Sequence, residues 1–129
     1  MSPRAVLDAS AILVLLLDEP GADKMTDDVM IRSVISTINL AEVQSKLVSR
    51  GYDSQAAWED ALSLVIDVEP FSQEMARIAG DLITKTKPYG LSLGDRSCLA
   101  LAISLKGEVY TTDRRWKTLK LGIPIHVIR

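Results

Sequence analysis

The stretch Leu91–Ser104 reads LSLGDRSCLALAIS, and from Cys98 onward it is apolar on nearly every side. Such a pattern is typical of a helix that is buried in the interior of a protein. The first turn of this helix nevertheless holds two charged residues, Asp95 and Arg96. We therefore expect a core helix that begins at a polar edge of the fold.

Around this helix, short apolar runs alternate with helical patterns. The predicted strands are Arg4–Asp8, Ser33–Thr37, Ile66–Glu69, Glu108–Thr112 and Pro124–Val127. The predicted helices cover residues 9–17, 22–30, 39–51, 54–65, 72–86 and 91–104, with a short helical turn over residues 114–120. Alternation of this kind implies right-handed crossovers between parallel strands. We predict a single α/β domain over residues 1–129, a three-layer sandwich whose mostly parallel sheet of about five strands has helices on both faces.

The composition is that of an ordinary globular domain. Hydrophobic residues make up 47% of the chain and charged residues 25%, which excludes a chain that is disordered throughout. The net charge of −2 does not indicate a nucleic-acid-binding protein, so such a role needs a local basic patch. The apolar run 11–17 is shorter than the roughly 20 residues that cross a bilayer. The single cysteine, Cys98, suits a reducing compartment, and together these features predict a cytoplasmic protein with no membrane segment.

Four carboxylates lie at equivalent places in the predicted layout. Asp8 ends the first strand and Asp113 follows the fourth, while Glu42 and Asp95 lie in the first turns of helices. All four are therefore expected at the carboxyl ends of the parallel strands, where open α/β sheets bind their ligands.

Helix capping is the better explanation of each acid when it is taken alone. Asn39 and Ser92 each stand three residues before one of the acids, as in a capping box, and Asp8 and Asp113 lie where N-caps often lie. Four carboxylates in one crevice are harder to explain in this way. At a separation of about 6 Å, each pair repels by on the order of 3 kcal/mol at an effective dielectric constant of about 20.

Either of two things would relieve this repulsion: the pKa values rise so that some of the acids stay neutral, or a divalent cation occupies the pocket. Oxygen ligands suit Mg²⁺ or Mn²⁺, whereas Zn²⁺ prefers histidine and cysteine. The only histidine, His126, lies in the last predicted strand, and we expect it to be an ordinary strand or surface residue.

Four segments in this order resemble the PIN-domain ribonucleases, and in particular the VapC-type toxins of VapBC toxin–antitoxin pairs. They are Val6–Ala11 (VLDASA), Asn39–Val43 (NLAEV), Leu93–Ala100 (LGDRSCLA) and Thr111–Trp116 (TTDRRW). The resemblance covers nearly the whole chain and implies a PIN-like fold.

The resemblance implies a metal-dependent endoribonuclease that hydrolyses RNA phosphodiester bonds with a metal-activated water. The residues that match the catalytic positions are Asp8, Glu42, Asp95 and Asp113. Of these, Asp8, Asp95 and Asp113 match the ligands of Mg²⁺ or Mn²⁺, and Glu42 would orient water. The hydroxyls of Ser10 and Thr111 match positions that support the pocket.

The chain departs from the family pattern at Arg115, where many relatives carry a further acid. This departure favours one metal ion over two. It also enlarges a local basic set, whose members are Arg114, Arg115, Lys117 and Lys120. That set could hold phosphate groups, and a solvated helix face explains it equally well.

The resemblance also implies two protein partners, a small VapB-type antitoxin and a second copy of the chain. Candidate surfaces for them are Leu13, Leu16, Leu17, Trp58 and Leu62, although ordinary core packing accounts for most of these residues equally well.

Three other functions compete with that of a nuclease. A response-regulator receiver needs paired acids after the first strand, and a haloacid-dehalogenase-type phosphatase needs Asp-x-Asp, but Asp8 stands alone and position 10 is Ser10. The remaining alternative is a catalytically silent PIN-fold binding or scaffold protein, which keeps the pocket for stability.

Overall fold

A parallel sheet organises the part of the chain that the computed structural model describes, residues 2–129. Its strands are β1 (Ala5–Leu7), β2 (Ser33–Ser36), β3 (Asp67–Glu69), β4 (Glu108–Thr111) and β5 (Ile125–Val127). They lie in the order β3-β2-β1-β4-β5, and every neighbouring pair is parallel. The predicted α/β sandwich is therefore confirmed, with a sheet that is wholly rather than mostly parallel.

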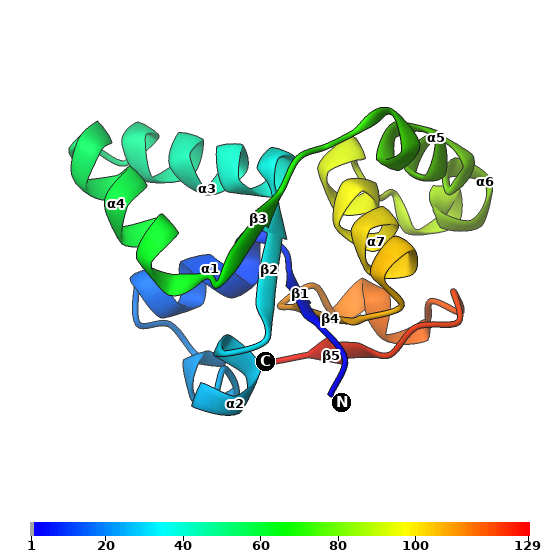
Figure 1. Cartoon of the computed structure of the whole chain (residues 1–129), viewed down its shortest axis with the longest axis horizontal. Helices are drawn as coiled ribbons and strands as arrows, with labels where there is room; N and C mark the ends of the chain where they lie inside the picture. Colours follow the sequence, from blue (N-terminus) through cyan, green and yellow to red (C-terminus); the bar gives the residue numbers. More distant parts are fainter. Residues whose placement is uncertain (1) are drawn as a thin grey trace.

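Helices cover both faces of this sheet (Figure 1). The α-helices are α1 (Ala9–Leu16), α2 (Asp27–Met30), α3 (Thr37–Ser49), α4 (Ser54–Leu64), α5 (Gln73–Asp81), α6 (Ile83–Thr86) and α7 (Leu93–Leu105). Short 3₁₀ turns are η1 (Ala22–Lys24), η2 (Lys87–Tyr89) and η3 (Arg114–Thr118). Helices α1, α3 and α4 lie on one face, and α5, α6 and α7 lie on the other (Figure 1). The chain reverses its direction of travel across the sheet between β3 and β4, so β1 and β4 flank a topological switch point.

Two of the predicted helices are divided in the structure. The segment 22–30 forms η1 and α2, because the Thr26 hydroxyl accepts the Val29 N–H and begins a new helix there. The segment 72–86 forms α5 and α6, with the break at Leu82.

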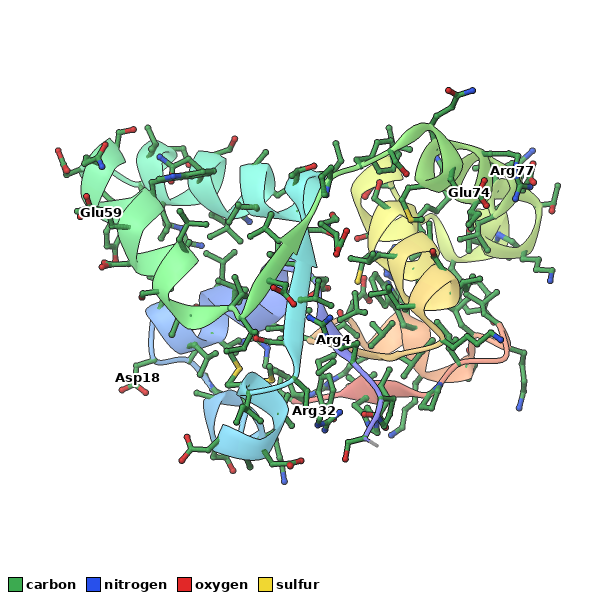
Figure 2. All side chains as sticks on the ribbon, viewed as in Figure 1. Arg4, Asp18, Arg32, Glu59, Glu74 and Arg77 are labelled. Atoms are coloured by element: carbon green, nitrogen blue, oxygen red, sulfur yellow. The ribbon has the colours of Figure 1, made fainter. Side chains whose placement is uncertain are left out.

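The amino ends of the strands are joined by two arginines (Figure 2). Arg4 donates to the Arg32 carbonyl and to Asp67, and Arg32 pairs with Glu108 at 3.2 Å. These contacts connect the first residues of β3 and β4 to the segments that precede β1 and β2. This end of the sheet is therefore closed by ion pairs, which leaves the carboxyl end as the open edge.

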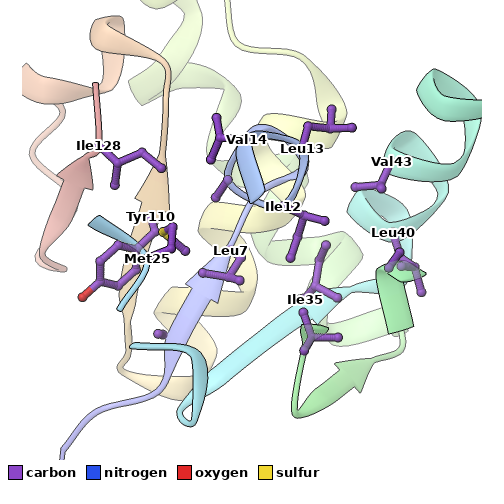
Figure 3. Close-up of a cluster of buried hydrophobic side chains, with 14 of the residues drawn as sticks. Leu7, Ile12, Leu13, Val14, Met25, Ile35, Leu40, Val43, Tyr110 and Ile128 are labelled. Atoms are coloured by element: carbon purple, nitrogen blue, oxygen red, sulfur yellow. The ribbon is translucent and has the colours of Figure 1, made fainter. Parts of the chain in front are cut away.

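Two apolar clusters fill the space between the layers. Leu7 and Ile35 point from the sheet toward α1 and α3 (Figure 3). Val6 and Val109 point to the other side, where they pack with α5, α7 and the fully buried Trp116. Because adjacent strand residues face opposite sides, both faces of β1 are apolar, as expected for a strand covered by helices on both sides.

The residues proposed as partner surfaces divide between core and surface. Leu13 is buried in the core, and Leu16 and Leu17 are partly buried against it. Trp58 and Leu62, one turn apart on α4, are 39% and 38% exposed.

Candidate metal and nucleic-acid site

All four predicted acids line one cleft at the carboxyl ends of the strands. The cleft has a volume of about 350 Å³, and its walls include Asp8, Glu42, Asp95 and Asp113. It lies where Asp8 follows β1 and Asp113 follows β4, beside the topological switch point. The structure thus brings the predicted residues together, and their catalytic role stays a prediction.

Asp8 is held at the base of the cleft by neutral donors. Its Oδ1 accepts the Ser10 hydroxyl at 2.6 Å and the Ala11 N–H at 2.9 Å, and its Oδ2 accepts the Thr111 hydroxyl at 2.6 Å. The two hydroxyls are fixed in turn, because Ser10 accepts the Thr112 N–H and Thr111 accepts the Asp113 N–H. Asp8 therefore caps α1, as predicted, and it also joins the ends of β1 and β4.

Burial makes the charge on Asp8 costly. The pKa of this carboxyl is raised to about 6. Burial is the largest cause and the nearby charge of Asp95 adds to it, while the three hydrogen bonds lower the pKa. No lysine or arginine within residues 2–129 forms an ion pair with Asp8. A buried anion with no cationic partner in its own chain is suited to receive an external cation.

Asp95 combines capping with exposure to the cleft. Its Oδ2 accepts the Ser92 N–H at 3.0 Å and its own N–H donates to the Ser92 hydroxyl at 3.1 Å, so the predicted capping box is confirmed. The adjacent Arg96 points away from the cleft, since its Nη1 donates to the Ala79 carbonyl of α5 at 2.9 Å. The two charges in the first turn of α7 therefore have separate tasks: Arg96 fixes the helix to its neighbour, and Asp95 faces the cleft.

Glu42 reaches the cleft from α3 and rests against α7. Asn39 donates from its Nδ2 to Glu42 Oε1 at 2.7 Å and to the Gly94 carbonyl at 3.0 Å. The expected capping box of Asn39 and Glu42 is wrong, because Ser36 caps α3 instead. Asn39 is buried one turn inside the helix, where it positions Glu42.

A glycine makes room for the carboxylate of Glu42. A Cβ on Gly94 would lie 2.7 Å from Glu42 Cδ, which is too close for any real contact. A side chain at position 94 would therefore displace the Glu42 carboxylate at the point where α7 meets α3.

Among the ion pairs of residues 2–129, Asp113 is the one acid of the four that is paired with a cation. The Arg115 guanidinium holds the pKa of the Asp113 carboxyl below its usual range, although partial burial acts against this shift. The closest contact joins Arg115 Nη2 and Asp113 Oδ2 at 2.6 Å.

Cys98 packs behind the acids and does not act as a nucleophile in this setting. Burial raises the pKa of its thiol well above the usual range, and the charges of Asp8, Asp95 and Glu42 raise it further. The thiol therefore stays neutral and serves as a small apolar side chain, as the sequence predicts.

The donor chemistry of the cleft fits a hard divalent cation. Asp8 Oδ2, Glu42 Oε2 and Asp95 Oδ1 each keep an acceptor position that no donor within residues 2–129 uses, and all are carboxylate oxygens. As arranged, no three Asp, Glu, His or Cys side chains of the described chain stand close enough together to hold a metal ion. Binding of a cation would therefore need side-chain movements toward it.

A second, basic groove continues from the acidic cleft. It has a volume of about 240 Å³ and shares Ser10, Leu13, Lys46 and Thr112 with the cleft. Its cationic lining residues are Lys46, Arg50 and Arg129. The groove thus places positive charge directly beside the carboxylates.

This groove was not predicted from the sequence, and the predicted basic patch lies elsewhere. Its four residues, Arg114, Arg115, Lys117 and Lys120, line neither the cleft nor the groove. The sequence does contain a pattern that indicates the groove. Charged residues recur every four positions and so form one stripe along α3; they are Glu42, Lys46 and Arg50.

The family profile of the PIN domain matches residues 5–121, and the chain belongs to the PIN domain family. No curated protein matches the chain. Its structure is similar to that of VapBC from Salmonella typhimurium bound to DNA, with a TM-score of 0.73, 19% sequence identity and 98% of each chain covered. It is also similar to VapBC2 from Rickettsia felis bound to a DNA fragment from its promoter, with a TM-score of 0.72, 19% identity, and 95% of this chain and 96% of that chain covered. FitAcB from Neisseria gonorrhoeae gives a TM-score of 0.70 at 18% identity, with 94% of this chain and 95% of that chain covered. Identities this low show a shared fold.

Every helix within residues 2–129 is too short or too polar to cross a membrane.

Proposed function

We propose that this protein is a Mg²⁺- or Mn²⁺-dependent endoribonuclease and the toxin of a type II toxin–antitoxin pair. The observation that carries the proposal is the cleft itself, where four carboxylates meet at the switch point of the sheet and a basic groove adjoins them. PIN domains are generally nucleases that use divalent metals, which agrees with this chemistry.

Each residue has a defined task in this proposal. Asp8 and Asp95 would hold the cation, with Asp113 as the third predicted ligand, and Glu42, fixed by Asn39, would orient water in the cleft. The cation would supply a Lewis acid that activates water and stabilises negative charge on the phosphoryl oxygens. The groove would hold the neighbouring phosphates of the RNA strand.

RNA cleavage by the purified protein tests the proposal. Asp95→Asn should lower the cleavage rate on the order of 100-fold or more, as for the loss of a charge that stabilises a transition state. Asparagine still accepts the Ser92 N–H, so α7 keeps its cap. Chelation with EDTA should abolish cleavage, and added Mn²⁺ should restore it.

Asp53→Asn is the matched control, because Asp53 also caps a helix with its carboxylate but lies outside the cleft. It should leave the rate unchanged. Cleavage that survives both EDTA and Asp95→Asn would contradict the metal mechanism.

A catalytically silent scaffold is the second candidate. It is favoured by the fact that no three donors of the described residues are arranged to hold a metal and that Asp113 is paired with Arg115. Calorimetric titration with Mn²⁺ separates the two candidates, since a scaffold would bind no ion and cleave no RNA.

The proposed protein partner is a small VapB-type antitoxin, in a cytoplasmic complex. The structural neighbours are VapBC complexes, and Trp58 and Leu62 form an exposed apolar pair on α4 that an amphipathic segment could cover. A homodimer remains a prediction from the resemblance. Co-purification with the product of a short adjacent open reading frame tests the partner, and Trp58→Ser with Leu62→Ser should weaken that complex.

A further inference from the structure

The fourth acid of the cleft is bound by Arg115 through a dense set of contacts. Arg115 Nε lies 3.0 Å from Asp113 Oδ1 and 3.2 Å from Oδ2, and Nη2 lies 2.6 Å from Oδ2. The backbone N–H of Arg115 donates to Oδ1 at 3.0 Å. Both oxygens of Asp113 are therefore engaged by a single residue two positions along the chain.

These contacts use most of the acceptor capacity of Asp113. A carboxylate has about four lone-pair positions, and three N–H groups of Arg115 reach the two oxygens in four contacts, because Nε–H is shared between Oδ1 and Oδ2. By contrast, none of Asp8, Glu42 and Asp95 pairs with a lysine or arginine within the described chain. The four acids therefore differ in charge compensation, although they line the same cleft.

A second contact holds the guanidinium in this orientation. Arg115 Nη1 donates to the Tyr89 carbonyl at 2.7 Å, at the end of η2. The planar guanidinium thus bridges the loop after β4 and the loop before α7. Such a fork geometry matches a carboxylate better than the point charge of a lysine does.

We propose that Arg115 is a built-in counter-ion that withdraws Asp113, the third ligand that the family resemblance implies, from metal binding, so that the site takes one divalent cation, on Asp8 and Asp95 with Glu42 in place of Asp113. This inference rests on the proposed metal-dependent function. The guanidinium supplies, as part of the chain, the positive charge that a second metal ion would otherwise bring to Asp113. Removal of Arg115 would return Asp113 to the cleft as a free carboxylate and create a second cation position.

Mn²⁺ binding to the whole purified protein, without RNA, tests this inference. Calorimetry should give one ion per chain for the unmodified protein and two for Arg115→Ala. Electron paramagnetic resonance should show isolated Mn²⁺ in the first case and exchange-coupled Mn²⁺ in the second. Arg115→Gln, which also removes the charge but keeps a longer polar side chain, should behave like Arg115→Ala and serves if the alanine variant does not fold.

Two further variants complete the experiment. Arg114→Ala removes the same charge from the adjacent residue, whose Nε donates only to the Arg129 carbonyl, and should still bind one ion. Adding Asp113→Asn to Arg115→Ala should return the count from two to one. Two ions in the unmodified protein, or one in Arg115→Ala, would overturn the inference while leaving the nuclease proposal intact. Absence of any Mn²⁺ binding to the unmodified protein would instead contradict the proposed function, and the inference with it.

Discussion

Asp8 is a buried carboxyl group that forms no ion pair with a lysine or arginine of residues 2–129. Its pKa rises from 3.8 to about 6, a difference on the order of 3 kcal/mol between the two protonation states. Between these two pH values the folded protein holds a proton that the unfolded chain has released. The free energy of unfolding therefore falls as pH rises through this window. Above pH 6 the folded protein bears the full cost of holding Asp8 in its ionised form.

This shift predicts competition between protons and metal ions at Asp8. At pH 5 about a tenth of the folded molecules carry the Asp8 carboxylate, so the apparent affinity for Mn²⁺ should be about tenfold weaker than above pH 7. Saturating Mn²⁺ should accordingly raise the melting temperature more at pH 7.5 than at pH 5, as followed by thermal unfolding.

Asp8→Asn provides the comparison for this experiment. Its Mn²⁺-induced stabilisation should be small at both pH values, and in the apo form the difference in stability between it and the unmodified protein should change between pH 4 and pH 6. An equal Mn²⁺ effect on the unmodified protein at pH 5 and pH 7.5 would show that Asp8 does not bind the ion.

At the scale of elements, the site depends on how closely α3 approaches α7. Glu42 occupies the space where a side chain at Gly94 would lie. Gly94→Ala should therefore displace the Glu42 carboxylate and lower RNA cleavage by up to about 100-fold, the cost of a misplacement of roughly 1 Å. Cleavage rate and melting temperature measured on the same variant separate this effect from unfolding.

Gly80→Ala is the control for this substitution. Gly80 lies in α5, and a Cβ there would meet nothing within 4 Å. Because alanine favours helix over glycine by up to about 1 kcal/mol, Gly80→Ala should raise the melting temperature and leave cleavage unchanged. If Gly94→Ala also keeps full activity, Glu42 has no role in catalysis.

Much of this element structure could be predicted from the sequence. The strands that enter the central sheet are short apolar runs, and the acids follow strands or begin helices, so parallel packing alone carries them to one edge. The capping box at Ser92 and Asp95 is a local pattern that the sequence contains in full. Such features depend on residues close together in the chain and on the spacing of apolar residues, both of which a sequence displays directly.

Other features depend on contacts that a sequence does not display. Ser36 rather than Asn39 caps α3, because the amide of Asn39 is used to hold Glu42 and the Gly94 carbonyl. The pairing of Arg115 with Asp113 depends on a side-chain conformation that Tyr89, 26 positions away, helps to fix. In both cases a side chain has several possible hydrogen-bond partners, and the folded structure determines which partner it takes.

At the scale of the whole molecule, charged side chains gather at the two ends of the strands. Arg4 and Arg32 join the amino ends, whereas the acids and the adjoining basic groove occupy the carboxyl end. A protein with a net charge of −2 can therefore present positive charge locally to a nucleic acid.

The groove predicts a specific salt dependence of RNA binding. In the Asp95→Asn background, the double substitution Lys46→Ala and Arg50→Ala should lower the slope of log affinity against log salt concentration by about 1.4, since each contact to single-stranded phosphate contributes about 0.7. Fluorescence anisotropy over a range of salt concentrations measures this slope.

Arg77→Ala with Lys85→Ala is the matched control, because it removes the same charge from α5 and α6 on the other face of the sheet. Figure 2 shows Arg77 beside Glu74 at the outer side of the molecule, where Arg77 forms only exposed ion pairs. The salt-dependence slope of this double variant should equal that of the Asp95→Asn protein. Equal slopes for both double variants would place the RNA outside the groove.

The hydroxyl of Thr111 binds Asp8 across 103 positions of sequence, and Thr112 binds Ser10 across 102. Asp8 is synthesised well before these partners, which enter the sheet only when β4 pairs with β1. Contacts between such distant segments form late in folding, because a long loop must close first. On the proposed nuclease function, we therefore expect a nascent chain that ends before β4 to be harmless to the ribosome and messenger RNA that are producing it, so that the capacity to cut RNA arises only after β4 has been synthesised.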